Sequence, residues 1–200
     1  MPPPSQPPNT TLYFAYGSNL SLSQMHTRCP TSTYLGIARL TGYTWLINQR
    51  GYANIVEATS PTQDPPPPAA SEPEEKEEKE VYGLVYALPP ASLASLDISE
   101  GVPTAYTKER QRVSFWASPA PDSPARVARD YAAARVDTTA QPPTETEVEM
   151  LVYIDRRRVG AGKPREEYVG RMERGVGDAV GLGVPRAYVE GVVRRFVPGG

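Results

Sequence analysis

Tyr13-Phe14-Ala15-Tyr16-Gly17-Ser18-Asn19-Leu20 is the stretch around which the fold is organised, because it joins a strand to a helix near the start of the chain. Its first four residues favour a strand, and Gly-Ser-Asn favours a turn. Ser21 and Gln24 then stand at the spacing of a helix capping box, which predicts that a helix follows at once. A glycine turn between a strand and a helix leaves backbone N–H groups that can bind an anion or a developing oxyanion. The same joint is also a common structural turn.

The length of the chain and its low-complexity segments indicate how many domains it can form. The chain has 200 residues, which is enough for one domain with a hydrophobic core once the biased segments are set aside. Residues 1–10 are proline-rich and predict a disordered tail. Residues 60–80 combine a proline run with a run of Glu and Lys, which predicts a disordered, solvated insertion. We therefore expect a single domain over residues 11–198 that carries this insertion.

Composition excludes several classes of function. The net charge of −2 argues against a nucleic-acid partner. The single cysteine, Cys29, excludes an internal disulfide, and together with the single histidine, His26, it leaves no metal site of the usual ligand count. No stretch is long and apolar enough to span a membrane. We expect no cofactor, no metal, no membrane partner, a cytoplasmic location and a small molecule as the partner, with a homodimer left open.

His26 and Cys29 raise one alternative chemistry. They lie three residues apart on the helix predicted at residues 21–29, so their side chains could meet, and a cysteine nucleophile with a histidine base is one possible chemistry. The sequence offers no third group to orient such a pair, and packing or surface roles are therefore favoured.

Hydrophobic patterns predict the remaining elements. Strands are expected at residues 12–16, 34–40, 43–48, 53–57, 81–88, 107–116, 126–137 and 148–154. Helices are expected at residues 21–29, 91–97, 165–180 and 185–196, and proline loops at residues 118–124 and 138–147. Turn signals between the second, third and fourth strands favour an antiparallel meander. The pattern favours an α+β fold, a small mixed β-barrel with flanking helices, in which the strand at 81–88 is central.

A second motif follows the predicted helix at residues 91–97. In Leu96-Asp97-Ile98-Ser99-Glu100-Gly101-Val102 a carboxylate stands at an irregular joint immediately before a glycine. Glu100 is either a surface loop acid, with Gly101 ending the helix, or an acid that points into a cleft.

The two motifs in this order resemble the γ-glutamylcyclotransferase family (AIG2-like). Intervening pieces fit as well, including Ile37-Ala38-Arg39-Leu40, Ala53-Asn54-Ile55-Val56 and Val81-Tyr82-Gly83-Leu84-Val85-Tyr86. The resemblance covers residues 12–106 well and continues more weakly to residue 198. It implies a carbon–nitrogen lyase with a barrel of this kind, which cyclises a γ-glutamyl amino acid or amine to 5-oxoproline without a cofactor.

The resemblance also implies roles for particular residues. Glu100 matches the catalytic glutamate, acting first as a base and then as an acid, for which its pKa should be raised by burial. Residues 13–20 match the substrate loop. Tyr106 and Tyr168 match tyrosines that close the pocket, although a core role is equally open for Tyr168.

Two other classes of function are compatible with these residues. Glu100 could activate water in an amide hydrolase, and the pocket could belong to a non-catalytic γ-glutamyl-binding module. The substrate is also open among a γ-glutamyl amino acid, a γ-glutamyl amine and a glutathione conjugate. Free glutathione is disfavoured, because glutathione-specific relatives lack a residue of the Asn19 type in this loop.

Overall fold

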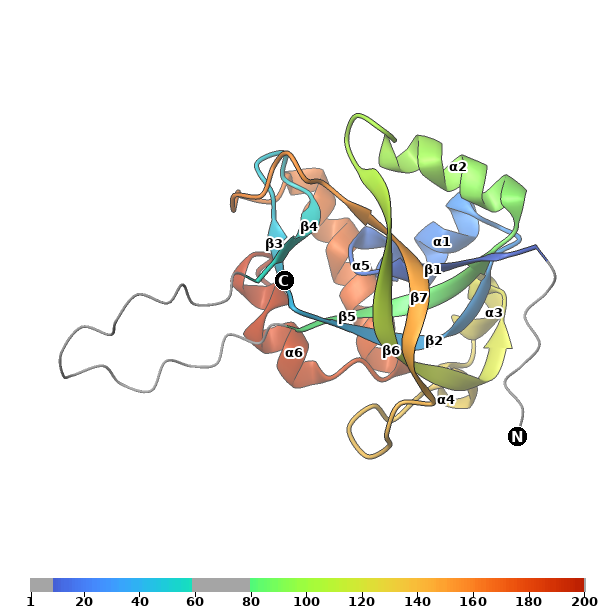
Figure 1. Cartoon of the computed structure of the whole chain (residues 1–200). Helices are drawn as coiled ribbons and strands as arrows, with labels where there is room; N and C mark the ends of the chain where they lie inside the picture. The colour runs from blue at the N-terminus through green and yellow to red at the C-terminus, as the bar shows by residue number, and fades with distance from the viewer. Residues whose placement is uncertain (1–8, 59–79, 200) are drawn as a thin grey trace, which may run out of the picture.

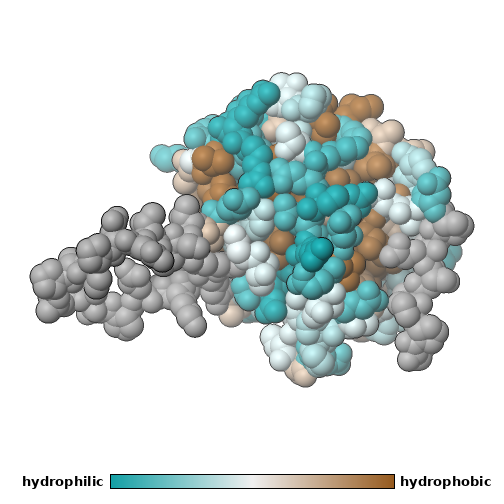
Figure 2. Space-filling model, in the orientation of Figure 1, coloured by the Kyte–Doolittle hydropathy of each residue, from teal (hydrophilic) through white to brown (hydrophobic). Residues whose placement is uncertain are grey.

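The computed structural model describes residues 9–58 and 80–199 (Figure 1). The tail predicted at residues 1–10 and the insertion predicted at residues 60–80 fall almost wholly outside these ranges, so both stay predictions. In the described ranges no helix is both long and apolar enough to cross a membrane. The face seen in Figure 2 is mostly hydrophilic, with scattered apolar residues.

Five strands close into a barrel in the order β1, β5, β2, β6 and β7. Their bounds are Thr11–Ala15 for β1, Thr33–Thr41 for β2, Glu80–Leu88 for β5, Thr107–Asp122 for β6 and Glu145–Ile154 for β7. Strand β1 runs antiparallel to β5 and parallel to β7, so the sheet is mixed. The α+β fold with a small mixed barrel is therefore confirmed. Strand β5, which was predicted to be central, pairs with β1 on one edge and β2 on the other, and every strand of the closed barrel has two partners in this way.

Strands β3 (Tyr43–Ile47) and β4 (Ala53–Glu57) form a separate two-stranded sheet. The predicted hairpin between them is confirmed, but the three-stranded meander is wrong. Strand β2 pairs with β5 on one edge and β6 on the other, so it has no free edge for β3. The hairpin packs on the barrel instead, where the Trp45 indole N–H donates to the Tyr16 carbonyl over 3.0 Å.

The helices lie around the barrel (Figure 1). They are α1 (Leu22–Arg28), α2 (Pro90–Glu100), α3 (Pro124–Val127), α4 (Tyr131–Ala134), α5 (Glu166–Leu182) and α6 (Arg186–Gly191), with 3-10 turns η1 (Ser18–Leu20) and η2 (Val193–Arg195). Ser21 caps α1 as predicted, because its side chain accepts the Gln24 backbone N–H. Gln24 does not return this bond to Ser21; its side-chain amide donates instead to Ser18 Oγ and Asn19 Oδ1.

Helix α2 runs to Glu100, three residues beyond its predicted end. Gly101 ends it in the left-handed conformation at φ 65°, and its N–H bonds to the carbonyls of Asp97 and Ile98. Glu100 is therefore the last residue of a helix, and the irregular joint predicted around it is wrong. A helical position gives its side chain a more rigid base than a loop would.

Other predictions in the second half need correction. The loop predicted at residues 118–124 is mostly strand, since β6 continues to Asp122. Its prolines are tolerated because, within the described sheet, the residues between Ala117 and Asp122 do not pair with β2. The strand predicted at residues 126–137 is replaced by α3 and α4, where alanines favour a helix and Asp130 caps it. Helix α5 passes Gly181 and ends at Gly183, and the final helix breaks into α6 and η2.

Candidate active site

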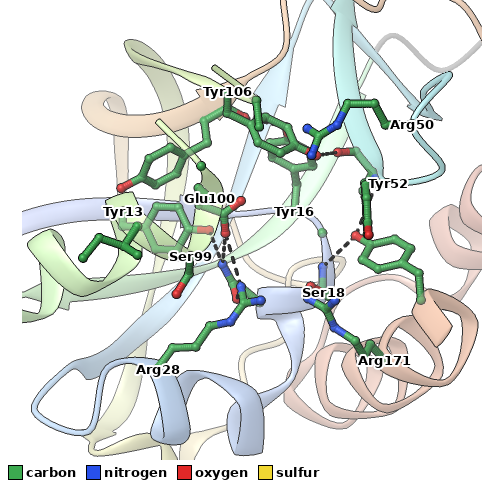
Figure 3. Close-up of a pocket in the computed structure, with 18 residues that line it drawn as sticks. Tyr13, Tyr16, Ser18, Arg28, Arg50, Tyr52, Ser99, Glu100, Tyr106 and Arg171 are labelled. Carbon is green, nitrogen blue, oxygen red and sulfur yellow. Dashed lines mark hydrogen bonds and ion pairs between the residues drawn. The ribbon is translucent and has the colours of Figure 1, made fainter. Parts of the chain in front are cut away.

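A pocket lies where the loop after β1, the C-terminal end of α2, the β3–β4 turn and the start of α5 meet (Figure 3). Tyrosines form much of its wall, namely Tyr13, Tyr16, Tyr52, Tyr106, Tyr153 and Tyr168. The charged residues of its wall are one acid, Glu100, and three arginines, Arg28, Arg50 and Arg171. The lining therefore joins one carboxylate to an excess of positive charge.

Asn19 connects the two motifs found in the sequence, which lie 81 residues apart. Its Nδ2 donates to Glu100 Oε1 over 2.8 Å and to the Tyr13 hydroxyl over 2.9 Å. Its Oδ1 accepts from Gln24 Nε2 over 2.8 Å and from Arg28 Nη1 over 2.9 Å. An amide that uses both donor hydrogens and both lone pairs is fixed in orientation, so Asn19 holds one oxygen of Glu100 in place.

The two oxygens of Glu100 have different surroundings. Oε1 accepts the Asn19 bond and also lies 3.4 Å from Arg28 Nη1. Oε2 accepts no hydrogen bond from the described part of the chain, and it is the oxygen left for a ligand. The side chain is 16% exposed, so ligand and solvent reach it only from the pocket.

Burial raises the pKa of Glu100 above its usual value. Arg28, the Asn19 hydrogen bond, Arg171 and Arg50 each lower this pKa, but together they do not cancel the cost of desolvating the carboxylate. A carboxylate whose pKa is raised is a stronger base than an ordinary one, and after it has accepted a proton it can return it.

Tyr106 and Tyr168 meet at the backbone of Ala53 in β4. The Tyr168 hydroxyl accepts the backbone N–H of Ser18 over 3.2 Å and that of Ala53 over 3.3 Å, and the Tyr106 hydroxyl donates to the Ala53 carbonyl over 2.8 Å. Burial raises the Tyr168 pKa to about 12, so the phenol stays protonated. Both tyrosines line the pocket, and Tyr168 also ties its loop to the β3–β4 hairpin.

The loop of residues 13–20 divides between the pocket and the core. Its pocket-lining members are Tyr13, Tyr16, Gly17, Ser18 and Asn19. Phe14, Ala15 and Leu20 were predicted to bind substrate, but they are packed in the core and do not line the pocket. Gly83 of β5 leaves the space that Phe14 and Ala15 fill, and Gly175 of α5 lies against Leu20. The predicted backbone cradle is also reduced, because the Ser18 N–H is already bonded to Tyr168.

Comparisons with known proteins identify the family of this chain. The family model described as gamma-glutamyl cyclotransferase, AIG2-like, matches residues 13–147, which include both motifs. The chain belongs to this family.

Relatives and solved structures extend the comparison. A gamma-glutamylcyclotransferase of Bos taurus is 34% identical over 98 residues, 49% of this chain and 48% of the relative, and one of Homo sapiens is 33% identical over 91 residues, 46% and 44%. The match therefore spans about half the length of these relatives.

A solved structure titled gamma-glutamyl cyclotransferase has a TM-score of 0.59 at 22% identity, over 91% of this chain and 85% of that one. An uncharacterized human protein has a TM-score of 0.58 at 23% identity, over the same shares. These two likenesses show that the fold is the family's fold.

Three arginines of the pocket were missed by the sequence analysis. Arg28 and Gln24 lie four residues apart on α1, and both contact Asn19. Residues at this spacing share one face of a helix, so the sequence could have predicted that Arg28 lies on the same side as Gln24. Arg171 follows Tyr168 by three residues on α5, and its Nη2 donates to Ser18 Oγ over 2.9 Å. Arg50 lies in the turn between β3 and β4, where no periodic pattern points to a site.

The cysteine–histidine alternative is wrong. Cys29 is fully buried, its Sγ lies 3.4 Å from the Ser92 carbonyl, and burial raises its pKa to about 11. His26 is exposed, so the two side chains do not face one pocket. A buried thiol with a raised pKa is a poor nucleophile.

Proposed function

We propose that this protein is a γ-glutamylcyclotransferase, which converts a γ-glutamyl amino acid to 5-oxoproline and the free amino acid. The observation that carries the proposal is Glu100, whose Oε1 is held by Asn19 while Oε2 is open to a buried, tyrosine-lined pocket. The nucleophile of this reaction is the α-amine of the substrate itself. One positioned carboxyl group can therefore serve the chemistry, without an activated side-chain nucleophile.

Glu100 moves one proton in each direction. Its carboxylate takes a proton from the α-ammonium, and the neutral amine attacks the γ-carbonyl carbon to close the five-membered ring. The leaving nitrogen receives this proton from Glu100 as the tetrahedral intermediate breaks its carbon–nitrogen bond, and Glu100 is a carboxylate again. The ring nitrogen then gives up its second hydrogen as a proton, and the released amine takes up a proton to become an ammonium. Glu100 ends as it began, and its raised pKa makes it a stronger base for the first transfer than a carboxylate with the usual pKa.

Arg28 is the proposed ligand of the α-carboxylate. The α-amine and the α-carboxylate share one carbon atom, so a group that binds the carboxylate must lie beside the base. Arg28 meets this condition, because its Nη1 is 3.4 Å from Glu100 Oε1. The oxyanion that forms on the γ-carbonyl is assigned to the backbone N–H groups of Gly17 and Asn19, since the Ser18 N–H is bonded to Tyr168.

The test is a panel of γ-glutamyl dipeptides and γ-glutamyl amines with the wild type and Glu100→Gln, which keeps the shape and removes the base. We expect 5-oxoproline from the wild type and a loss of about a hundredfold or more in the variant. Glu190→Gln is the matched control, because Glu190 is exposed on α6. Thermal unfolding checks that both variants fold.

Each other result has a definite meaning. Glutamate in place of 5-oxoproline would identify an amide hydrolase. Binding without any product would identify a binding module. Equal rates in wild type and Glu100→Gln would refute the role of Glu100.

A further inference from the structure

The reaction described above uses neither Arg50 nor Arg171, and of these two pocket arginines Arg50 is the one whose side chain has no polar partner among the described residues. Arg28 pairs with Glu100 and Asn19. Arg171 donates to Ser18 and Gln24 and pairs with Glu167. For the Arg50 side chain, by contrast, the described residues supply neither a hydrogen-bond acceptor nor a carboxylate.

The guanidinium of Arg50 is nonetheless held in place. Its backbone N–H donates to Asn48 Oδ1 over 3.0 Å, and its carbonyl accepts from Arg165 Nε over 2.9 Å. The guanidinium carbon lies 5.3 Å from the ring centre of Tyr52 and 5.7 Å from that of Tyr106. Contacts with two aromatic rings restrict the group and leave its N–H groups available for a planar acceptor.

One nitrogen of this group has no acceptor among the residues described. Nη1 of Arg50 is buried, and it has no hydrogen-bond partner within the part of the chain that the structure describes. A buried charged donor without an acceptor is costly, and a carboxylate is the acceptor that best matches a guanidinium. Nη1 itself lies beneath the pocket surface. The other nitrogens of this guanidinium are not buried and also have no acceptor among the described residues, so they are available to a group that the ligand supplies.

The position of Arg50 identifies which group of the ligand this is. Figure 3 shows Arg50 beside Tyr106 and Tyr52, across the pocket from Arg28. The amine and α-carboxylate of the γ-glutamyl part are assigned to Glu100 and Arg28, which are in contact with each other. The carboxylate of the leaving amino acid is two bonds from the leaving nitrogen, at the other end of the substrate.

We propose that Arg50 binds the carboxylate of the leaving amino acid and thereby selects γ-glutamyl amino acids over γ-glutamyl amines. This inference rests on the proposed function. It also matches the charges: the pocket carries three arginines and one glutamate, and a γ-glutamyl amino acid carries two carboxylates and one ammonium. A γ-glutamyl amine lacks the second carboxylate and would leave Arg50 without an acceptor.

The first test compares turnover of γ-glutamyl-alanine with that of its C-terminal carboxamide, which differs only in the charge of the leaving group. We expect the wild type to prefer the carboxylate by about tenfold to a hundredfold in kcat/KM, as for hydrogen bonds to a charged group. In Arg50→Gln this ratio should fall to near one, and Arg50→Lys should keep part of it. Arg157→Gln removes an exposed arginine and should keep all of it.

The second test measures binding, so that it does not depend on turnover. In Glu100→Gln, calorimetric titration should show tighter binding of γ-glutamyl-alanine than of its carboxamide, and adding Arg50→Gln should remove the difference. No 5-oxoproline from any substrate would refute the proposed function, while the titration would still decide the role of Arg50. A preference that survives in Arg50→Gln, or an equal loss for both ligands, would overturn the inference.

Discussion

Replacing Asn19 by Asp tests the contact on which the candidate site depends. The substitution keeps the size of the side chain and the oxygen that accepts from Gln24 and Arg28. It replaces the Nδ2 donor, 2.8 Å from Glu100 Oε1, by a carboxylate oxygen. Two carboxylates then face each other, and they should share one proton over a wide range of pH.

The size of the effect follows from the geometry. Two unit charges about 4 Å apart at an effective dielectric constant of about 20 repel by about 4 kcal/mol, or about three pKa units. Arg28 stays beside both groups and offsets part of this repulsion. We therefore expect the pKa of the pair's second ionisation to lie about one to three units above the pKa of Glu100 in the wild type.

The assay is the pH dependence of kcat/KM for 5-oxoproline release. A base must be deprotonated to act, so activity is lost as the pH falls through its pKa, and a higher pKa moves this acid limb to higher pH. Gln141→Glu makes the same change from amide to carboxylate on an exposed side chain and should leave the limb in place. An unchanged limb in a folded Asn19→Asp protein would refute either the Asn19–Glu100 contact or the assignment of Glu100 as the base.

Two further predictions concern the site and the scaffold. Arg28→Gln removes a charge that lowers the pKa of Glu100, so the acid limb of kcat/KM for this variant should move to higher pH by about one unit. The control is Arg157→Gln, which should keep the wild-type limb. If the limbs of the two variants lie at the same pH, the ion pair between Arg28 and Glu100 is contradicted. Gly183→Ala should destabilise the protein by at least about 2 kcal/mol in urea unfolding, because a Cβ would lie 1.8 Å from the Val136 carbonyl at φ 114°. Gly177 lies inside α5, where an added Cβ meets open space, so Gly177→Ala should instead stabilise the protein by about 0.5–1 kcal/mol. Similar effects of the two substitutions would show that the close contact at Gly183 is absent.

Predictions that depend on local pattern were confirmed most closely. The strand expected at residues 53–57 is β4, and the strand expected at 81–88 is β5 within one residue. Both are short apolar runs bounded by turn or charge signals. The strand expected at residues 126–137 was wrong because its spaced valines resemble a strand, while Asp130 and the alanines after it favour a short helix.

Predictions that depend on pairing were less successful. The meander failed because both edges of β2 are occupied by strands that come later in the chain. Likewise, Phe14, Ala15 and Leu20 share a motif with Tyr13 and Asn19 but pack in the core. Adjacency in a motif does not show which side chains turn toward the pocket and which fill the space left by Gly83 and Gly175.

The sequence by itself determined the chemistry available to this protein. One histidine and one cysteine left carboxylates, hydroxyls and backbone groups for any reaction, and the two motifs predicted the loop and Glu100 as partners. Tertiary structure decided how these groups act. Closure of the barrel and packing of α1, α2 and α5 around the loop bring Asn19, Arg28 and Arg171 to the same pocket as Glu100. Burial raises the pKa of Glu100 and leaves one nitrogen of Arg50 without a partner in residues 9–58 and 80–199, and burial depends on contacts between residues far apart in the chain.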